Sequence, residues 1–93
     1  MNSLIVLNQN DNVGVSQFII PEKTKIEGKD IVTKDPIPFG HKVCLKAVNK
    51  GDPIIKYDQI IGFASKNINP GEHVHSHNLE FKEFDRKYKV TEK

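Results

Sequence analysis

Three of the four histidines in this 93-residue chain fall within five positions, at His73, His75 and His77. Side chains two residues apart in a strand share one face and lie about 6.5–7 Å apart along the chain. We therefore expect the three imidazoles on one face of a strand and Val74 on the other. Imidazole suits zinc, iron, copper and nickel. No Cys or Asp joins the run to close a structural site, so the pattern predicts either an open metal site or a solvated polar strand face.

The fourth histidine lies in a second polar segment. Gly40 permits a close turn, after which His41 and Lys42 stand at the mouth of a strand. A histidine beside a lysine can bind a carboxylate, or act as a base with its charge partner. Further along, Lys56 precedes Tyr57 and offers another contact for an anion. The alternative at each place is an ordinary exposed basic side chain.

Composition narrows the class of protein. The 14 basic and 12 acidic residues are mixed along the chain without a basic block, so we expect no nucleic-acid partner. Apolar runs such as 4–7 are far shorter than the roughly 20 residues of a membrane span, and no signal-peptide pattern is present. The single cysteine, Cys44, cannot form an internal disulfide, which fits a cytoplasmic protein with a structural thiol. Phosphate-binding loops, nucleophile elbows and Cys-x-x-Cys pairs are lacking.

The pattern of apolar residues predicts an all-β fold. Short apolar runs recur between turn signals, and no window carries a helical stripe. The expected extended segments are 4–7, 13–20, 31–32, 42–47, 54–55, 60–61 and 72–77. We expect one domain over 1–93, with a core at about 8–79 and a charged tail at 80–93 that begins as a docked strand or a short helix.

An internal repeat supports this fold. Segment 46–54 aligns with 66–74, and both contain an apolar residue, two turn residues, a glycine, an acid, one further residue and a β-branched apolar residue. This order predicts a strand, a tight turn whose glycine has a positive φ, and a returning strand. A degenerate third copy is 20–26, where Lys23 replaces the glycine.

Taken in order, these motifs resemble the N-terminal SAF domain of the altronate and galactarate dehydratases, and also the small alpha subunit of sulfolactate sulfo-lyase. The resemblance rests on Asp11-Asn12-Val13, Gly40-His41-Lys42-Val43, Ile54-Ile55-Lys56-Tyr57, Ile61-Gly62 and the run from Asn69 to Leu79. It implies a small β-clip domain. The chain departs from the family at Glu22-Lys23, where a glycine turn is usual, and at Cys44, where a small residue is common. The large catalytic domain of these enzymes is not in this sequence.

The resemblance also implies a function. It suggests the small subunit, or N-terminal-type domain, of a metal-dependent sugar-acid dehydratase, which is a carbon–oxygen lyase that is not autonomous without a separate large catalytic chain. It implies Fe(II), or else Mn(II), at His73 and His75. It implies substrate contacts from His41, Lys42, Lys56, Tyr57, His77 and Asn78, and it assigns no catalytic residue. The alternative is a stand-alone module that binds a carbohydrate acid or a metal without catalysis. Exposed strand edges also allow pairing with a second copy.

Overall fold

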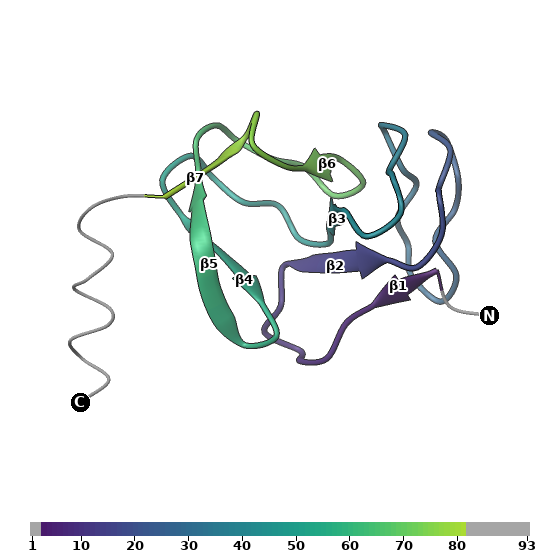
Figure 1. The fold of residues 1–93 in the computed structure, drawn as a ribbon, viewed down its shortest axis with the longest axis horizontal. Helices are drawn as coiled ribbons and strands as arrows, with labels where there is room; N and C mark the ends of the chain where they lie inside the picture. Colours follow the sequence, from purple (N-terminus) through teal and green to yellow (C-terminus); the bar gives the residue numbers. More distant parts are fainter. Residues whose placement is uncertain (1–2, 82–93) are drawn as a thin grey trace.

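The computed structural model of the chain describes residues 3–81, and strands are its regular elements (Figure 1). In order they are β1 (Leu4–Ile5), β2 (Val13–Ser16), β3 (Lys42–Cys44), β4 (Pro53–Lys56), β5 (Gln59–Ala64), β6 (His73–Val74) and β7 (Leu79–Glu80). The prediction of a small all-β fold is confirmed. In residues 3–81 there is no helix with the length and hydropathy that a bilayer crossing requires.

The strands form two small antiparallel sheets. The first has the order β1-β2-β3-β6, and the second has the order β4-β5-β7. In Figure 1 the second sheet lies on the left, and the long connection from β2 to β3 (blue to teal) folds back and forth on the right. The short strands leave much of the chain in turns, which therefore carry most of the polar side chains of interest.

The repeated turn recognised in the sequence organises one half of the molecule. Gly51 and Gly71 both have positive φ, at 92° and 93°, as the repeat requires. The apolar residues that open the two copies, Val48 and Ile68, form an antiparallel bridge with each other. The first residues of the two copies therefore lie side by side in antiparallel directions.

The other half is built in the same way. Lys23 has a φ of 64°, so in the third copy it adopts the left-handed conformation that glycine adopts in the first two. The structure reveals a fourth copy at 37–43, in which Gly40 has a φ of 82°. Ile20 and Ile37, which open these two copies, form an antiparallel bridge.

Each half has its own hydrophobic core. The apolar residues that open and close the copies are all buried, and they divide between two clusters: Val48, Ile54, Ile68 and Val74 in one, and Ile20, Ile26, Ile37 and Val43 in the other. Strands β3 and β6 join the halves, with Lys42 opposite Val74 and Val43 opposite His73. The histidine-rich segment consequently lies where the two halves meet.

Several expected strands are shorter than the apolar pattern suggested. Only His73–Val74 of the segment expected at 72–77 is a strand. After Val74 the chain turns, and the carbonyl oxygen of His75 accepts hydrogen bonds from the amides of Asn78 and Leu79. The expectation that His75 and His77 continue a strand was therefore wrong. Of the tail, Leu79–Glu80 is a strand, and residues 82–93 lie outside the described range.

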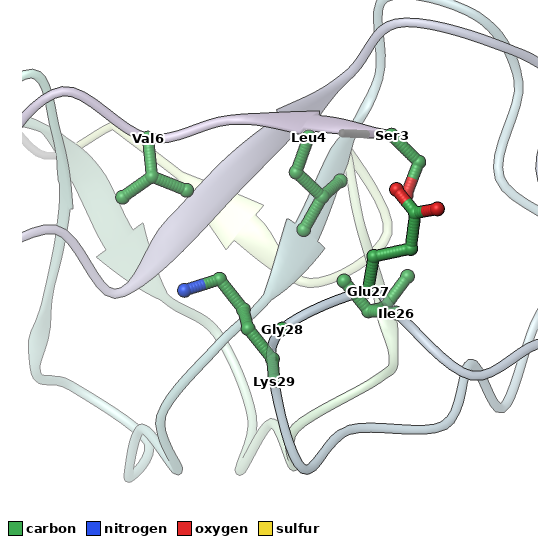
Figure 2. Close-up of a pocket in the computed structure, with 7 residues that line it drawn as sticks. All are labelled: Ser3, Leu4, Val6, Ile26, Glu27, Gly28 and Lys29. Atoms are coloured by element: carbon green, nitrogen blue, oxygen red, sulfur yellow. The ribbon is translucent and has the colours of Figure 1, made fainter. Parts of the chain in front are cut away.

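A pocket of about 260 Å³ opens between β1 and the turn at 26–29 (Figure 2). Its lining residues are Ser3, Leu4, Val6, Ile26, Glu27, Gly28 and Lys29. None of the candidate site residues lines this pocket, so it plays no part in the site described next.

Candidate metal centre

The structure brings three histidines together. His41, His73 and His75 each offer a ring nitrogen, and these nitrogens all lie within 4.8 Å of one another. Nδ1 of His41 lies 2.9 Å from Nε2 of His73, so one of these two nitrogens donates its proton to the other. The rings are close to parallel, with centroids 4.5 Å apart for His41 and His75 and 5.6 Å apart for His73 and His75. We call these three residues the histidine group.

The members of the group come from distant parts of the chain. His41 follows the turn at Pro38, whose carbonyl oxygen accepts a hydrogen bond from the His41 amide. The carbonyl oxygen of His41 accepts a hydrogen bond from the amide of Ser16, the last residue of β2. His73 begins β6, and its amide donates to Oδ2 of Asp35 at 3.0 Å. Pairing of β3 with β6 sets the distance between the two segments.

Asn78 holds the third member in place. Its Oδ1 accepts the amide of His75 at 2.9 Å, and its Nδ2 donates to the carbonyl oxygen of His73 at 2.9 Å. Asn78 is buried, and both ends of its side-chain amide are used within the protein. The residue therefore fixes the turn that carries His75 next to His73.

Electrostatics favour the metal-binding form of His73. Burial lowers the pKa of His73, and the neighbouring His41, His77 and His75 lower it further, while Asp35 opposes the shift. A lowered pKa keeps the imidazole neutral at neutral pH, and the neutral ring is the form that binds a metal.

The geometry of the group fits a divalent metal ion. Two nitrogens bound to a tetrahedral ion at about 2.0–2.1 Å lie roughly 3.3 Å apart, which is between the 2.9 Å of His41 and His73 and the 4.8 Å limit of the group. Three protein ligands leave at least one position open, as in catalytic rather than structural sites.

The other candidate residues lie around or behind this group. The ring of His77 is 5.4 Å from that of His73, but its nitrogen does not belong to the group. Lys42 shares a sheet face with Val74, whereas His73 lies opposite Val43 on the other face, because successive residues in a strand alternate. The side chain of Lys42 and the histidine group therefore lie on opposite faces of the four-stranded sheet.

Lys42 and Lys56 form a second cationic group. Burial lowers the pKa of Lys42, and the nearby charge of Lys56 lowers it further. The Nζ of Lys56 also lies 5.0 Å from the centre of the Tyr57 ring. Two ammonium groups held near each other, one of them half-buried, favour an anion as a neighbour.

Asp11, which the sequence showed only as part of the motif Asp11-Asn12-Val13, has a structural role. Oδ1 of this buried carboxylate accepts the amide of Asp58 at 2.7 Å. Tyr57 and Asp58 both have positive φ, at 56° and 63°, so this hydrogen bond stabilises a hairpin turn in the left-handed region. The turn carries Lys56 and Tyr57, and Asp11 therefore positions them.

Cys44 has the structural character expected of it. The thiol is fully buried in the first core cluster, and Sγ donates a hydrogen bond to the carbonyl oxygen of Lys46 at 3.0 Å. Burial raises the pKa of Cys44 to about 12. A buried thiol with such a pKa is not a nucleophile at neutral pH.

The fold and the site define a small all-β domain with an open group of three imidazoles. Residues 2–82 match the family model described as the altronate/galactarate dehydratase SAF domain, so the chain belongs to this family. It is 39% identical over 82 residues to altronate dehydratase of Bacillus subtilis (strain 168). It is 46% identical over 52 residues to (2R)-sulfolactate sulfo-lyase subunit alpha of Paracoccus pantotrophus.

The lengths of these relatives differ greatly. The Bacillus match covers 86% of this chain but only 16% of that dehydratase. A match to altronate dehydratase of Escherichia coli (strain K12), 36% identical over 70 residues, covers 73% of this chain and 14% of that protein. The Paracoccus match covers 56% of this chain and 78% of that alpha subunit. The chain thus corresponds to a small part of the dehydratases and to most of a short subunit.

Proposed function

We propose that this chain is the small, non-autonomous part of a metal-dependent lyase that acts on a sugar acid or a related hydroxy acid. The observation that carries the proposal is the histidine group, an open set of three imidazoles in a chain of the dehydratase SAF family. The names of the relatives support the reaction class, since they are an altronate dehydratase and a subunit of a sulfolactate sulfo-lyase.

In this proposal His73 and His75 bind the metal, and His41 joins them as a third ligand. Fe(II) is our first choice of ion and Mn(II) our second. A divalent ion here would polarise the carboxylate or hydroxyl group of the substrate as a Lewis acid. The contribution of this chain is to hold three imidazoles at a fixed spacing and to leave coordination positions open for the substrate.

The remaining candidates have different roles in this proposal, and only His77 lies beside a substrate bound at the metal. His77 is the best placed beside the metal, because its ring lies next to His73. Lys42, Lys56 and Tyr57, which were also expected to bind the substrate, lie on the opposite face of the sheet from the histidine group, so in this proposal they bind a separate anionic group. Asn78 contributes indirectly, since its amide holds the backbone of His73 and His75.

The proposed partner is a large catalytic chain equivalent to the rest of an altronate dehydratase. Purification of the chain from its source cells under anaerobic conditions tests this proposal. We expect a companion chain in fixed ratio that matches the remainder of the Bacillus enzyme, and iron or manganese in the complex. Recovery of the chain alone, without such a companion, would contradict the proposal.

A metal-binding module without catalysis is the second candidate, because this chain by itself assembles the three imidazoles. Replacement of His73 and His75 by alanine separates the two functions. Loss of lyase activity with the complex intact supports the lyase subunit. Loss of metal with unchanged lyase activity supports the module.

A further inference from the structure

Strand β6 is the outer strand of the first sheet, so one side of its backbone has no neighbouring strand. Backbone groups at such an edge need other hydrogen-bond partners. For His73 both partners are side chains: its amide donates to Oδ2 of Asp35 at 3.0 Å, and its carbonyl oxygen accepts a hydrogen bond from Nδ2 of Asn78 at 2.9 Å. The backbone that carries the His73 imidazole is therefore held by two side chains, and Asp35 is one of them.

The segment that carries Asp35 is fastened to the turn before His73. The amide of Lys34 donates to the carbonyl oxygen of Gly71 at 2.8 Å. Gly71 also approaches the carbonyl oxygen of Val32 so closely that a Cβ at position 71 would collide with it. The two segments therefore lie against each other, and their packing brings the carboxylate of Asp35 to the amide of His73.

The backbone of Asp35 has little freedom of its own. Asp35 precedes Pro36, and a residue before proline is restricted to extended conformations. The next residue, Ile37, is fully buried and forms an antiparallel bridge with Ile20. The carboxylate of Asp35 therefore meets the His73 amide from a backbone that is itself fixed.

The pairing of β6 with β3 is short for a strand that must place a metal ligand. Strand β6 has two residues, and two residue pairs join it to β3. His41, the proposed ligand beside His73, precedes β3, and its Nδ1 lies 2.9 Å from Nε2 of His73. Hydrogen-bond partners outside the ligand set orient the ligands of metal sites. Side chains that hold the His73 backbone therefore contribute to the spacing of the two imidazoles.

We propose that Asp35 is a positioning residue of the candidate metal centre, which holds His73 at the distance from His41 that a shared metal ion requires. This proposal rests on the proposed function, because it takes the histidine group as the metal site. Asp35 is not itself a member of that group. Its oxygen bonds to the backbone of His73 and not to the ring, so Asp35 acts on a bound metal through the placement of the imidazole.

A carboxylate can support a metal ligand by its hydrogen bond and by its negative charge. The charge of Asp35 opposes the lowering of the pKa of His73, but burial and the neighbouring histidines outweigh it. The charge is thus a weak influence on the ring, whereas the hydrogen bond fixes the backbone directly. Asparagine keeps an acceptor oxygen of the same reach without the charge, so it should replace Asp35 with little loss of metal affinity.

Titration of the full chain with Co(II), followed by the visible absorption of the bound ion, tests the proposal. We expect Asp35→Ala to lower the affinity for Co(II) about 10–100-fold, as the loss of other outer partners of metal ligands does. The absorption bands of the bound Co(II) should change as well, because the imidazoles no longer share one geometry. We expect Asp35→Asn to restore the wild-type bands and to bind within about threefold of the wild type, since the hydrogen bond is kept.

The matched control for a loosened segment is Thr33→Ala. Thr33 lies two residues before Asp35 and is buried, and its Oγ1 accepts the amide of Thr24 and donates to the carbonyl oxygen of Pro21. The variant removes two hydrogen bonds from the same segment without removing the contact to His73. We expect it to unfold at a lower urea concentration than the wild type but to bind Co(II) within about threefold of it.

Three results would overturn the proposal. The first is wild-type affinity and absorption in Asp35→Ala, and the second is an equal loss of Co(II) affinity in Asp35→Ala and Thr33→Ala. The third is an Asp35→Asn variant that binds as weakly as Asp35→Ala, because charge and not position would then be the contribution of Asp35. A wild-type chain that binds no Co(II) would overturn the proposed function together with this proposal, whereas the three results above leave the proposed function standing.

Discussion

At the scale of single residues, the 2.9 Å contact between His41 and His73 is the feature with most consequence. One of the two nitrogens in this contact carries a proton, which must move to the far nitrogen of the same ring before both can bind a metal ion. This change of tautomer releases no net proton from neutral rings, so metal binding should strengthen with rising pH only until the rings are neutral. The lowered pKa of His73 extends strong binding toward lower pH than for an ordinary histidine.

Replacement of His41 by alanine tests its assignment as the third ligand. The variant removes one nitrogen from the group, so we expect its affinity for Co(II) or Zn(II) to fall more than about 100-fold, beyond the effect of losing an outer partner of a ligand. The matched control is His77→Ala, which removes a neighbouring imidazole outside the group and should change the affinity less than about threefold. Isothermal titration calorimetry of the two variants measures this difference in metal affinity. A larger loss of affinity for His77→Ala than for His41→Ala would contradict the assignment of His41 as the third ligand.

The thiol of Cys44 gives a second prediction at this scale. Since its pKa is raised to about 12 and the side chain is buried, the folded protein should not react with a disulfide reagent at pH 8. After unfolding in guanidinium, one thiol per chain should react within minutes. Rapid reaction of the native chain would place Cys44 at the surface, contrary to this structure.

At the scale of elements, the turn after β6 decides which histidines can cooperate. A strand through 72–77 would have spread His73, His75 and His77 along one face, whereas the turn brings His75 back beside His73 and leaves His77 outside the group. In this turn the side chain of Asn78 makes two hydrogen bonds to the backbone of His73 and His75, where a strand would have hydrogen bonds to a neighbouring strand. Local sequence showed the three histidines but not the turn, because an asparagine in this position is compatible with a strand end as well.

Replacement of Asn78 by alanine should damage both stability and metal binding. It leaves the His75 amide and the His73 carbonyl oxygen without their partner, at a cost of about 1–3 kcal/mol in the free energy of unfolding. Urea unfolding measures the cost, and Co(II) titration measures the loss of affinity. Asn78→Asp keeps the acceptor for His75 and serves as the control. Equal stability of wild type and Asn78→Ala would contradict the role given to this side chain.

The repeated turns show what the sequence can and cannot predict about elements. The two copies with glycine were recognisable because Gly51 and Gly71 mark the positive φ, and the third was recognisable in spite of Lys23. The fourth, 37–43, was hidden because its acidic position is occupied by His41. Gly71 also allows a close approach, since a Cβ there would collide with the carbonyl oxygen of Val32.

At the scale of the whole molecule, a two-residue segment ties the two sheets together. Oδ1 of Asp11 accepts the Asp58 amide, and Oδ1 of Asn12 accepts the Ile55 amide at 2.7 Å. Both acceptors precede β2 in the first sheet, and both donors belong to the β4–β5 hairpin of the second. The motif that contains Asp11 and Asn12 was recognisable in the sequence, but contacts between residues 43 to 47 positions apart depend on the packing of the sheets.

Asp11 makes the stability of the fold depend on pH. Burial raises the pKa of its carboxyl group, but backbone hydrogen bonds outweigh this effect and leave the pKa below the ordinary 3.8; they come from Asp58, Tyr57, Asn8 and Leu7. Its stabilising contribution is therefore complete above the unfolded pKa and is lost as the pH falls through the lower folded value. We expect Asp11→Asn to unfold at lower urea concentration than the wild type at pH 7, with a smaller difference at pH 3. A difference that grows toward pH 3 would contradict the sign of this shift.

The site as a whole shows the same division between local and distant information. His73 and His75 stood out in the sequence because they are neighbours, but His41 entered the group only through the pairing of β3 with β6. Lys42 and His41, adjacent in the chain, were expected in one site, and the alternation of β3 separates their side chains. Register and sheet order set these relations, and neither is encoded in a local motif.

Turnover by the reconstituted enzyme tests the central claim most directly. The companion chain, purified under anaerobic conditions, is assayed on altronate, galactarate and sulfolactate with Fe(II), alone and with this chain added. We predict that one of these acids is converted only when both chains are present, and that a His73→Ala chain binds the companion but lowers the rate at least 100-fold. Conversion at the full rate by the companion alone would contradict the claim that this chain supplies part of the lyase site.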